Sequence, residues 1–179
     1  MYSRCISLFA GIAIAATGLA TAAHAAPKDK EFFENVSGTW KGPGEIVAGR
    51  YKGTKFTCSL TGSSPDGGKA GIKLDGSCRV GVFSQPMSAV ISQAGNSYKG
   101  KFLDGAKGKG LDVISGAVNG NKVVLGINRS KLNGAMIARL EDENAMKVTI
   151  SVKVGDKMIP VIGVNLNRDV DDIKVGSIK

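Results

Sequence analysis

The sequence predicts an all-β protein, a single up-and-down antiparallel β-barrel of about eight to ten strands with a short N-terminal helix. Three observations support this fold class. Short runs of alternating apolar and polar residues fill most of the chain, hairpin-type turn sequences separate them, and no stretch after residue 40 has a helical period. Because short connections make neighbouring strands pair in sequence order, the last strand can meet the first and leave no open edge.

Residues 1–25 precede the β-rich region and have the three parts of a secretory signal peptide. A basic start with Arg4 leads into the apolar run ISLFAGIAIAATGLATA, which ends in small residues before Ala26. The run is too short and too rich in alanine to favour the alternative, a permanent membrane anchor. We therefore expect cleavage near Ala26, a periplasmic or secreted protein, and no transmembrane span after processing.

The charge of the processed chain favours anionic partners. Removing 25 of the 179 residues leaves 154, which suits one domain. Without Arg4, 23 basic residues face 15 acidic ones, a net charge of +8. Outside the cytosol, such a charge suits anionic lipid, lipopolysaccharide or an acidic envelope protein, although an ordinary basic envelope protein fits equally well. The sequence has no pattern typical of a surface that stacks bases, so binding to nucleic acid is not predicted.

Cys58 and Cys78 are the two cysteines that remain after loss of the leader. An even pair in an exported chain predicts a disulfide, because the compartment is oxidising. The turn sequence SSPDGG lies between them, so the two cysteines can face each other across a hairpin. Their spacing is not that of a CxxC redox or zinc motif.

The processed chain divides into a helical segment at 26–36, a barrel domain at 37–168 and a polar tail at 169–179. The ten predicted strands span residues 37–48, 54–62, 69–80, 87–93, 98–104, 111–118, 122–129, 133–140, 145–154 and 158–167. In the three clearest strands, alternation turns these residues inward: Phe56, Cys58 and Leu60; Ile72, Leu74, Cys78 and Val80; Met146, Val148, Ile150, Val152 and Val154.

The sequence SGTWKGPGEI places the only tryptophan, Trp40, at the start of the first predicted strand. A short helix followed by Gly38-x-Trp40 resembles the opening motif of lipocalins and their calycin relatives. The resemblance implies that the indole closes one barrel end and that a basic side chain from the end of the last strand, here Arg168, covers it. Lipocalins have eight strands, whereas ten are predicted here. The simplest role for Trp40 is core packing, without contact to a ligand.

A second resemblance covers most of the processed chain. The pattern WxGxGxI, one hairpin disulfide and strands punctuated by glycine resemble small exported barrel proteins of alphaproteobacteria. This resemblance implies a periplasmic barrel and supplies no activity.

No catalytic, metal or cofactor site is predicted, and we expect the protein not to be an enzyme. The single histidine, His24, lies in the leader, so the processed chain lacks a Ser-His or Cys-His pair and the commonest metal ligand. Glu45 and the turn sequence Glu141-Asp142-Glu143 are best interpreted as solvated acids, because their spacing is not that of a calcium loop. GPGEIVAG precedes no helix and therefore is no phosphate loop.

The stretch YKGKFLDGAKGKG predicts a cationic surface. Lys99 and Lys101 would point outward from one strand, and Lys107 and Lys109 would follow in the next loop. Such a patch could bind an anionic lipid, lipopolysaccharide or an acidic protein. The alternative is a solvated outer face that keeps the sheet soluble.

Two binding functions are therefore expected. The first is a barrel that binds a small apolar or amphipathic ligand in its interior. The alternative is an interaction module or inhibitor-like envelope protein, with a filled barrel, a basic surface and an N-terminal segment, residues 26–36, that inserts into its partner. Phe32 and Phe33 of this segment could equally close the bottom of the barrel. An open apolar cavity favours the first and a filled core the second.

Overall fold

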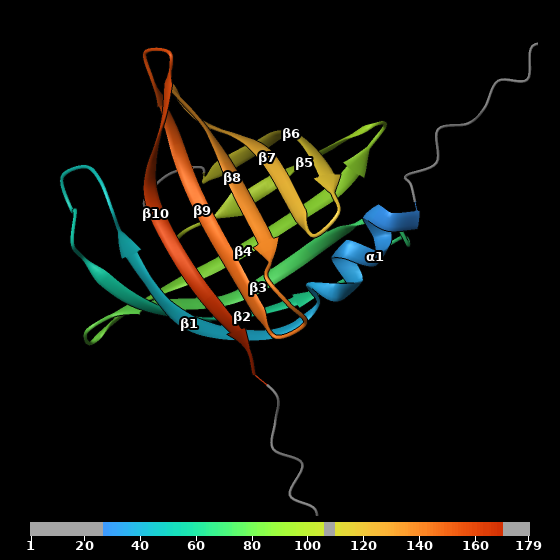
Figure 1. Ribbon diagram of the computed structural model, residues 1–179, viewed down its shortest axis with the longest axis horizontal. Coiled ribbons are helices and arrows are strands. Elements are labelled where there is room, and N and C mark those ends of the chain that lie inside the picture. The colour runs from blue at the N-terminus through green and yellow to red at the C-terminus, as the bar shows by residue number, and fades with distance from the viewer. Residues whose placement is uncertain (1–26, 106–109, 170–179) are drawn as a thin grey trace, which may run out of the picture.

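The computed structural model describes residues 27–105 and 110–169, which form one helix and ten strands (Figure 1). The predicted signal peptide and most of the polar tail lie outside these ranges. The elements are α1 (Pro27–Asn35), β1 (Gly38–Ile46), β2 (Lys55–Ser63), β3 (Gly71–Val80), β4 (Phe83–Ala94), β5 (Ser97–Leu103), β6 (Leu111–Asn119), β7 (Lys122–Arg129), β8 (Leu132–Leu140), β9 (Ala145–Val154) and β10 (Lys157–Arg168).

The ten strands form one closed antiparallel barrel. Each strand pairs with its neighbours in sequence, and β1 pairs with β10 to complete the cylinder. This confirms the predicted up-and-down barrel with a short N-terminal helix, at the upper end of the expected strand number. Every strand therefore has two hydrogen-bonded neighbours, and the sheet has no edge. Within the described ranges, no helix has the length and apolar character that crossing a membrane requires.

The helix α1 packs against one end of the barrel because its apolar residues lie on a single face. Phe32, Phe33 and Val36 are buried, while the residues around them are exposed. Asp29 lies in the first turn, where a carboxylate interacts favourably with the helix dipole. At the other terminus, Gly38 starts β1 with a φ of 109°, which favours glycine. The chain can therefore turn from the helix directly into the barrel wall.

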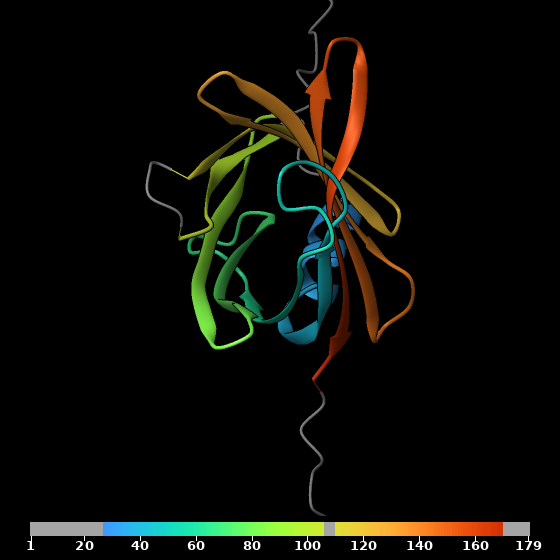
Figure 2. The ribbon, with the colours of Figure 1, turned by 90° about the vertical axis from the view of Figure 1, so that its left-hand side faces the viewer.

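The two ends of the barrel differ. Because the strands alternate in direction, the turns after β2, β4, β6 and β8 lie at the end that α1 covers, which we call the helix end. The turns after β1, β3, β5, β7 and β9 lie at the opposite end, which we call the far end. Figure 2 looks onto the far end, with α1 behind the strands. The far end has no covering helix among the described residues.

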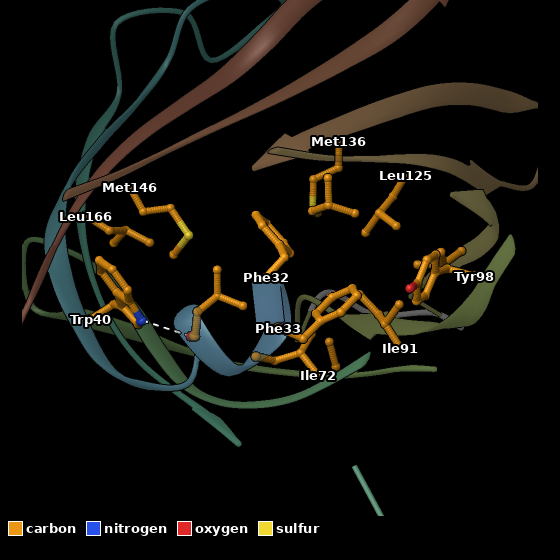
Figure 3. Close-up of a cluster of buried hydrophobic side chains, with 14 of the residues drawn as sticks. Phe32, Phe33, Trp40, Ile72, Ile91, Tyr98, Leu125, Met136, Met146 and Leu166 are labelled. Atoms are coloured by element: carbon orange, nitrogen blue, oxygen red, sulfur yellow. Dashed lines mark hydrogen bonds between the residues drawn. The ribbon is translucent and has the colours of Figure 1, made fainter. Parts of the chain in front are cut away.

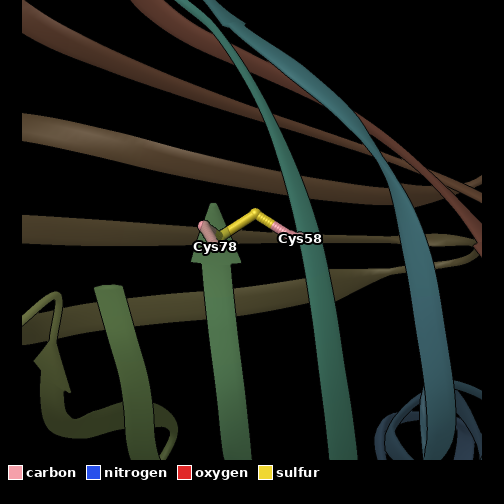
Figure 4. Close-up of a disulfide and its surroundings, with 2 residues drawn as sticks. All are labelled: Cys58 and Cys78. Carbon is pink, nitrogen blue, oxygen red and sulfur yellow. A yellow bond between two sulfur atoms is a disulfide. The ribbon is translucent and has the colours of Figure 1, made fainter. Parts of the chain in front are cut away.

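The predicted disulfide joins Cys58 on β2 to Cys78 on β3 (Figure 4). The two residues are direct cross-strand partners, and both side chains are buried. The bond therefore links the two strands on the inner side of the barrel, as the alternation predicts.

Two of the predicted inward positions are wrong. Val80 and Val154 are 45% and 61% exposed. Each is the last residue of its strand, next to a two-residue turn at the far end. The alternation continues to these residues, but their hairpins extend beyond the packed interior. Side chains on the inward side of the hairpins therefore have no core to pack against.

Candidate functional site

The barrel encloses a cavity of about 360 Å³. All ten strands and α1 contribute to its wall. Its volume lies within the range of small-molecule pockets, roughly 300–1,000 Å³. Several of its residues are only partly buried although they point inward, because part of their surface faces the cavity. These include Phe56, Leu60, Leu74, Met87, Phe102, Leu111, Val148, Ile150 and Ile162. The interior is therefore incompletely filled, and its lining is mainly apolar.

The helix end of the cavity is closed by aromatic packing (Figure 3). The ring of Phe33 lies 5.1 Å from that of Tyr98 and 5.4 Å from that of Phe32, measured between centroids. The hydroxyl of Tyr98 donates a hydrogen bond of 2.8 Å to Oδ2 of Asp29, which ties β5 to α1. Burial raises the pKa of Tyr98, and the hydrogen bond and negative charge of Asp29 raise it further. The N-terminal segment thus occupies the end of its own barrel.

Trp40 completes this closure. Its side chain is 1% exposed, and its Nε1 donates a hydrogen bond of 3.0 Å to the carbonyl oxygen of Val36 (Figure 3). Arg168 Cζ lies 4.4 Å from the centroid of the indole ring. A Cβ atom at Gly38 would lie 2.7 Å from Nη1 of Arg168, so glycine leaves room for the guanidinium. The structure brings Gly38, Trp40 and Arg168 together, the three residues that the lipocalin resemblance singles out.

Arg168 also has contacts that the sequence analysis missed. Its guanidinium donates hydrogen bonds to the carbonyl oxygens of Asn35 and Ser37 at 2.7 Å each, and to that of Glu143 at 3.0 Å. The carbonyl of Asn35 lies at the C-terminal end of α1, where carbonyl groups lack intrahelical partners and attract cations, and that of Ser37 lies in the segment that follows. The arginine therefore connects the helix, the last strand and the turn after β8. A basic residue at the end of the last predicted strand was the only signal for this role.

The other polar feature of the wall is a charged pair near the far end. Nη2 of Arg129 lies 2.6 Å from Oδ2 of Asp104, and Nε of Arg129 donates a hydrogen bond of 3.0 Å to the carbonyl oxygen of Gly110. Both side chains are partly exposed. Among the described residues that line the cavity, Asp104 and Arg129 are the charged ones, and Asn133 lies on the same wall.

The sequence contained a signal for this pair. Val123, Leu125 and Ile127 are buried on the inner face of β7, and Arg129 follows in the same phase. On the next but one strand, Phe102 faces the cavity and Asp104 follows two residues later. A charged residue that lies two positions after the last inward apolar residue of a strand therefore points toward the mouth of the barrel.

The predicted cationic patch is only partly within the described residues. Lys99 and Lys101 are exposed on β5, and Nζ of Lys101 lies 3.5 Å from Oδ1 of Asp112. Lys107 and Lys109 lie outside the described ranges. The structure therefore places the first two on the outer wall, away from the cavity.

The carboxylates considered in the sequence also lie away from the cavity. Glu45 is half-buried on β1, and Glu141, Asp142 and Glu143 are exposed in the turn after β8. None of the four lines the cavity. In residues 27–105 and 110–169, no three histidine, cysteine, aspartate or glutamate side chains gather as metal ligands would.

Comparison with solved structures finds the same type of fold. The crystal structure of Rv2717c from M. tuberculosis superposes with a TM-score of 0.58 at 13% sequence identity, over 81% of this chain and 99% of that one. At this identity the likeness shows the fold alone. No protein-family model matches the sequence, and no curated protein does.

Proposed function

We propose that the protein is an exported, non-enzymatic barrel that binds a small apolar or amphipathic molecule. The observation that carries this proposal is the cavity, because the transfer of an apolar group from water to its apolar wall is energetically favourable. The disulfide Cys58–Cys78 supports the exported location, since such bonds persist in oxidising compartments.

The distribution of polar groups favours one orientation of the ligand. The helix end offers the side chains of Phe32, Phe33 and Trp40, against which an apolar group packs. The far end offers Asp104 and Arg129, whose guanidinium has further N–H donors beyond its two contacts. A hydroxyl, amide or carbonyl head group would therefore lie near this pair, with the apolar part deeper in the barrel.

The alternative is an interaction module or inhibitor-like protein with a filled barrel. Two observations favour the ligand-binding function over it. The barrel retains a cavity, and the N-terminal phenylalanines Phe32 and Phe33 are buried against their own barrel. A segment that inserts into a partner would have to give up this packing.

A matched pair of variants on β4 tests the proposal. Met87 lines the cavity, whereas Val90 on the same strand is exposed on the outer wall. Met87→Trp fills part of the cavity and should displace about 60 Å² of ligand surface, or about 1.5 kcal/mol. We expect the affinity for a fluorescent fatty-acid or anilinonaphthalene probe to fall about tenfold. Val90→Trp should leave it unchanged.

Two results would contradict ligand binding in the cavity. The first is a wild-type protein that binds neither probe, and the second is an equal loss of affinity in both variants. Native mass spectrometry of protein purified from its own envelope fraction should show a small molecule that accompanies the barrel.

A further inference from the structure

The far end of the barrel carries large apolar side chains that point into solvent. Val82 is 90% exposed and Phe83 is 79% exposed, and both lie at the turn between β3 and β4. Single exposed apolar residues are common, but these belong to a set. The apolar rim comprises Tyr51, Val82, Phe83, Leu132, Val154 and Met158.

These residues come from four different hairpins at one end of the molecule. Tyr51 lies between β1 and β2, Leu132 follows the turn after β7, and Val154 and Met158 flank the turn after β9. Figure 2 shows these turns around the end of the barrel that faces the viewer. The same end holds the pair Asp104 and Arg129, so the rim surrounds the polar mouth of the cavity.

Basic residues lie between the apolar ones. Arg50, Lys52, Lys131 and Lys157 are exposed in or beside the same turns, where Asp156 is the exposed acid. The guanidinium of Arg50 lies 5.6 Å from the centroid of the Tyr51 ring. The turn after β8 at the helix end has the opposite charge, with Glu141, Asp142 and Glu143. This acidic turn therefore lies at the end opposite to the apolar rim and its basic residues.

We infer that the apolar rim docks onto the surface of an anionic lipid bilayer. Tyrosine and phenylalanine suit the interfacial layer, and lysine and arginine beside them suit anionic headgroups. The acidic turn at the opposite end would be repelled by the same headgroups, which favours this orientation. Docking in this orientation places the mouth of the cavity against the lipid.

A bilayer fits this surface better than a protein partner does. A protein interface needs a contiguous apolar core with a polar border. Here the apolar side chains lie on separate hairpins with basic residues between them. A bilayer can accommodate the turn of each hairpin independently. The proposed function enters this inference only as the reason for docking, because a docked barrel could exchange an amphipathic ligand with the membrane. The surface itself shares only Leu132 with the lining of the cavity.

Vesicle sedimentation tests the inference directly. We expect the wild-type protein to bind vesicles that contain phosphatidylglycerol more tightly than vesicles of phosphatidylcholine alone. Binding should weaken as salt rises from about 0.01 M to about 1 M, since the Debye length falls from about 30 Å to about 3 Å. A wild-type protein that does not prefer the anionic vesicles would overturn the inference.

Two double variants and two controls locate the surface. Val82→Ser with Phe83→Ser, and Lys52→Glu with Lys131→Glu, should each weaken binding at least about tenfold. All four residues are exposed, so the barrel core is untouched. The matched controls are Val90→Ser on the outer wall and Lys69→Glu at the helix end, both exposed, which should bind as the wild type does.

The other surfaces are distinguished in the same assay. If charge reversal at Lys99 and Lys101 weakens binding while the rim variants do not, the outer wall of β5 is the lipid-binding surface and our inference is wrong. If light scattering shows a dimer that the Val82→Ser and Phe83→Ser variant dissociates, the rim is covered by a second copy, and the inference is also wrong.

The proposals for the docking surface and for the ligand cavity can be refuted separately. The rim variants should keep the probe affinity of the wild type, and Met87→Trp should keep its vesicle binding. Loss of vesicle binding in Met87→Trp would overturn the independence of the two surfaces. Absence of probe binding in a wild-type protein that still docks would contradict the cavity function alone.

Discussion

Replacing Arg168 with alanine tests how the helix end of the barrel is held closed. The side chain stacks on Trp40 and donates hydrogen bonds to three carbonyl oxygens, those of Asn35, Ser37 and Glu143. The carbonyls belong to the end of α1, the segment that follows it and the turn after β8. Loss of one side chain therefore affects three connections at once.

The expected loss of stability follows from how well water can replace these contacts. The hydrogen bonds to Asn35 and Glu143 are exposed, so water compensates for most of their loss. The bond to Ser37 is partly buried and involves a charged donor, which is worth about 1.5–2 kcal/mol. Stacking of the guanidinium on Trp40 adds about 0.5–1 kcal/mol. We expect Arg168→Ala to lower the free energy of unfolding by about 2–3 kcal/mol.

Urea unfolding of the oxidised protein, followed by the emission of Trp40, measures this loss. In a thermal scan of the same protein, Arg168→Ala should lower the midpoint temperature by about 5–10 °C for a domain of this size, and it should change the emission of the folded state. Arg168→Lys should recover only part of the stability, because an ammonium lacks the planar fork. Arg79→Ala, at an exposed site on β3, is the control and should change stability by less than about 0.5 kcal/mol.

Either of two results would refute this account of the closure. One is an Arg168→Ala variant as stable as the Arg79→Ala control. The other is complete recovery by lysine, which would mean that charge alone matters. Trp40→Ala sets the upper limit, since removal of a large core aromatic costs about 3–5 kcal/mol.

Two further predictions concern covalent structure and pH. The intact mass of the exported protein should correspond to a chain that begins near Ala26 with Cys58 and Cys78 bonded; free thiols or a retained leader would contradict this, and replacing both cysteines with serine should cost about 3 kcal/mol. The raised pKa of Tyr98 means that the folded state holds its phenolic proton more tightly than the unfolded state does, so stability should fall as the pH rises above about 10. Tyr98→Phe should lose about 1 kcal/mol at neutral pH and show a smaller alkaline decrease in urea titrations; an unchanged alkaline slope would contradict a raised pKa of Tyr98 in the folded state.

The barrel could be predicted from the sequence because its strands alternate and its turns are short. Each alternation fixes which side chains share a face, and short turns fix which strands are neighbours. The same reasoning placed Cys58 opposite Cys78. Resemblance rather than alternation suggested that Arg168 covers Trp40, and their pairing in register across β1 and β10 explains why they meet.

Other features depend on properties that alternation does not contain. The period of a strand continues to its last residue, whereas the interior ends where the barrel wall ends. Val80 and Val154 were therefore placed in the core although they lie beyond it. Asp104 and Arg129 were overlooked for the complementary reason, because the inward alternation was not extended to charged residues at strand ends.

The size of the cavity could not be predicted from the sequence. It depends on the barrel radius, on the summed volume of all inward side chains and on how deeply α1 enters. Phe32 and Phe33 were expected either to close the barrel or to bind a partner. Only the packing of Phe33 against Tyr98, and of Phe32 against Phe33, distinguishes the two. A difference of a few side-chain volumes separates a filled core from an open one.

The pairing of β1 with β10 has a consequence for how the protein folds. Nine of the ten strand pairs join neighbours along the chain, whereas this one joins Trp40 to Arg168, 128 residues later. Forming it requires closure of a long loop, so we expect it to be completed late, and its contacts to slow unfolding more than they speed folding. Until that step, the curled sheet exposes two unpaired edges and its apolar inner face together. The period before closure is therefore when the chain is most prone to aggregate.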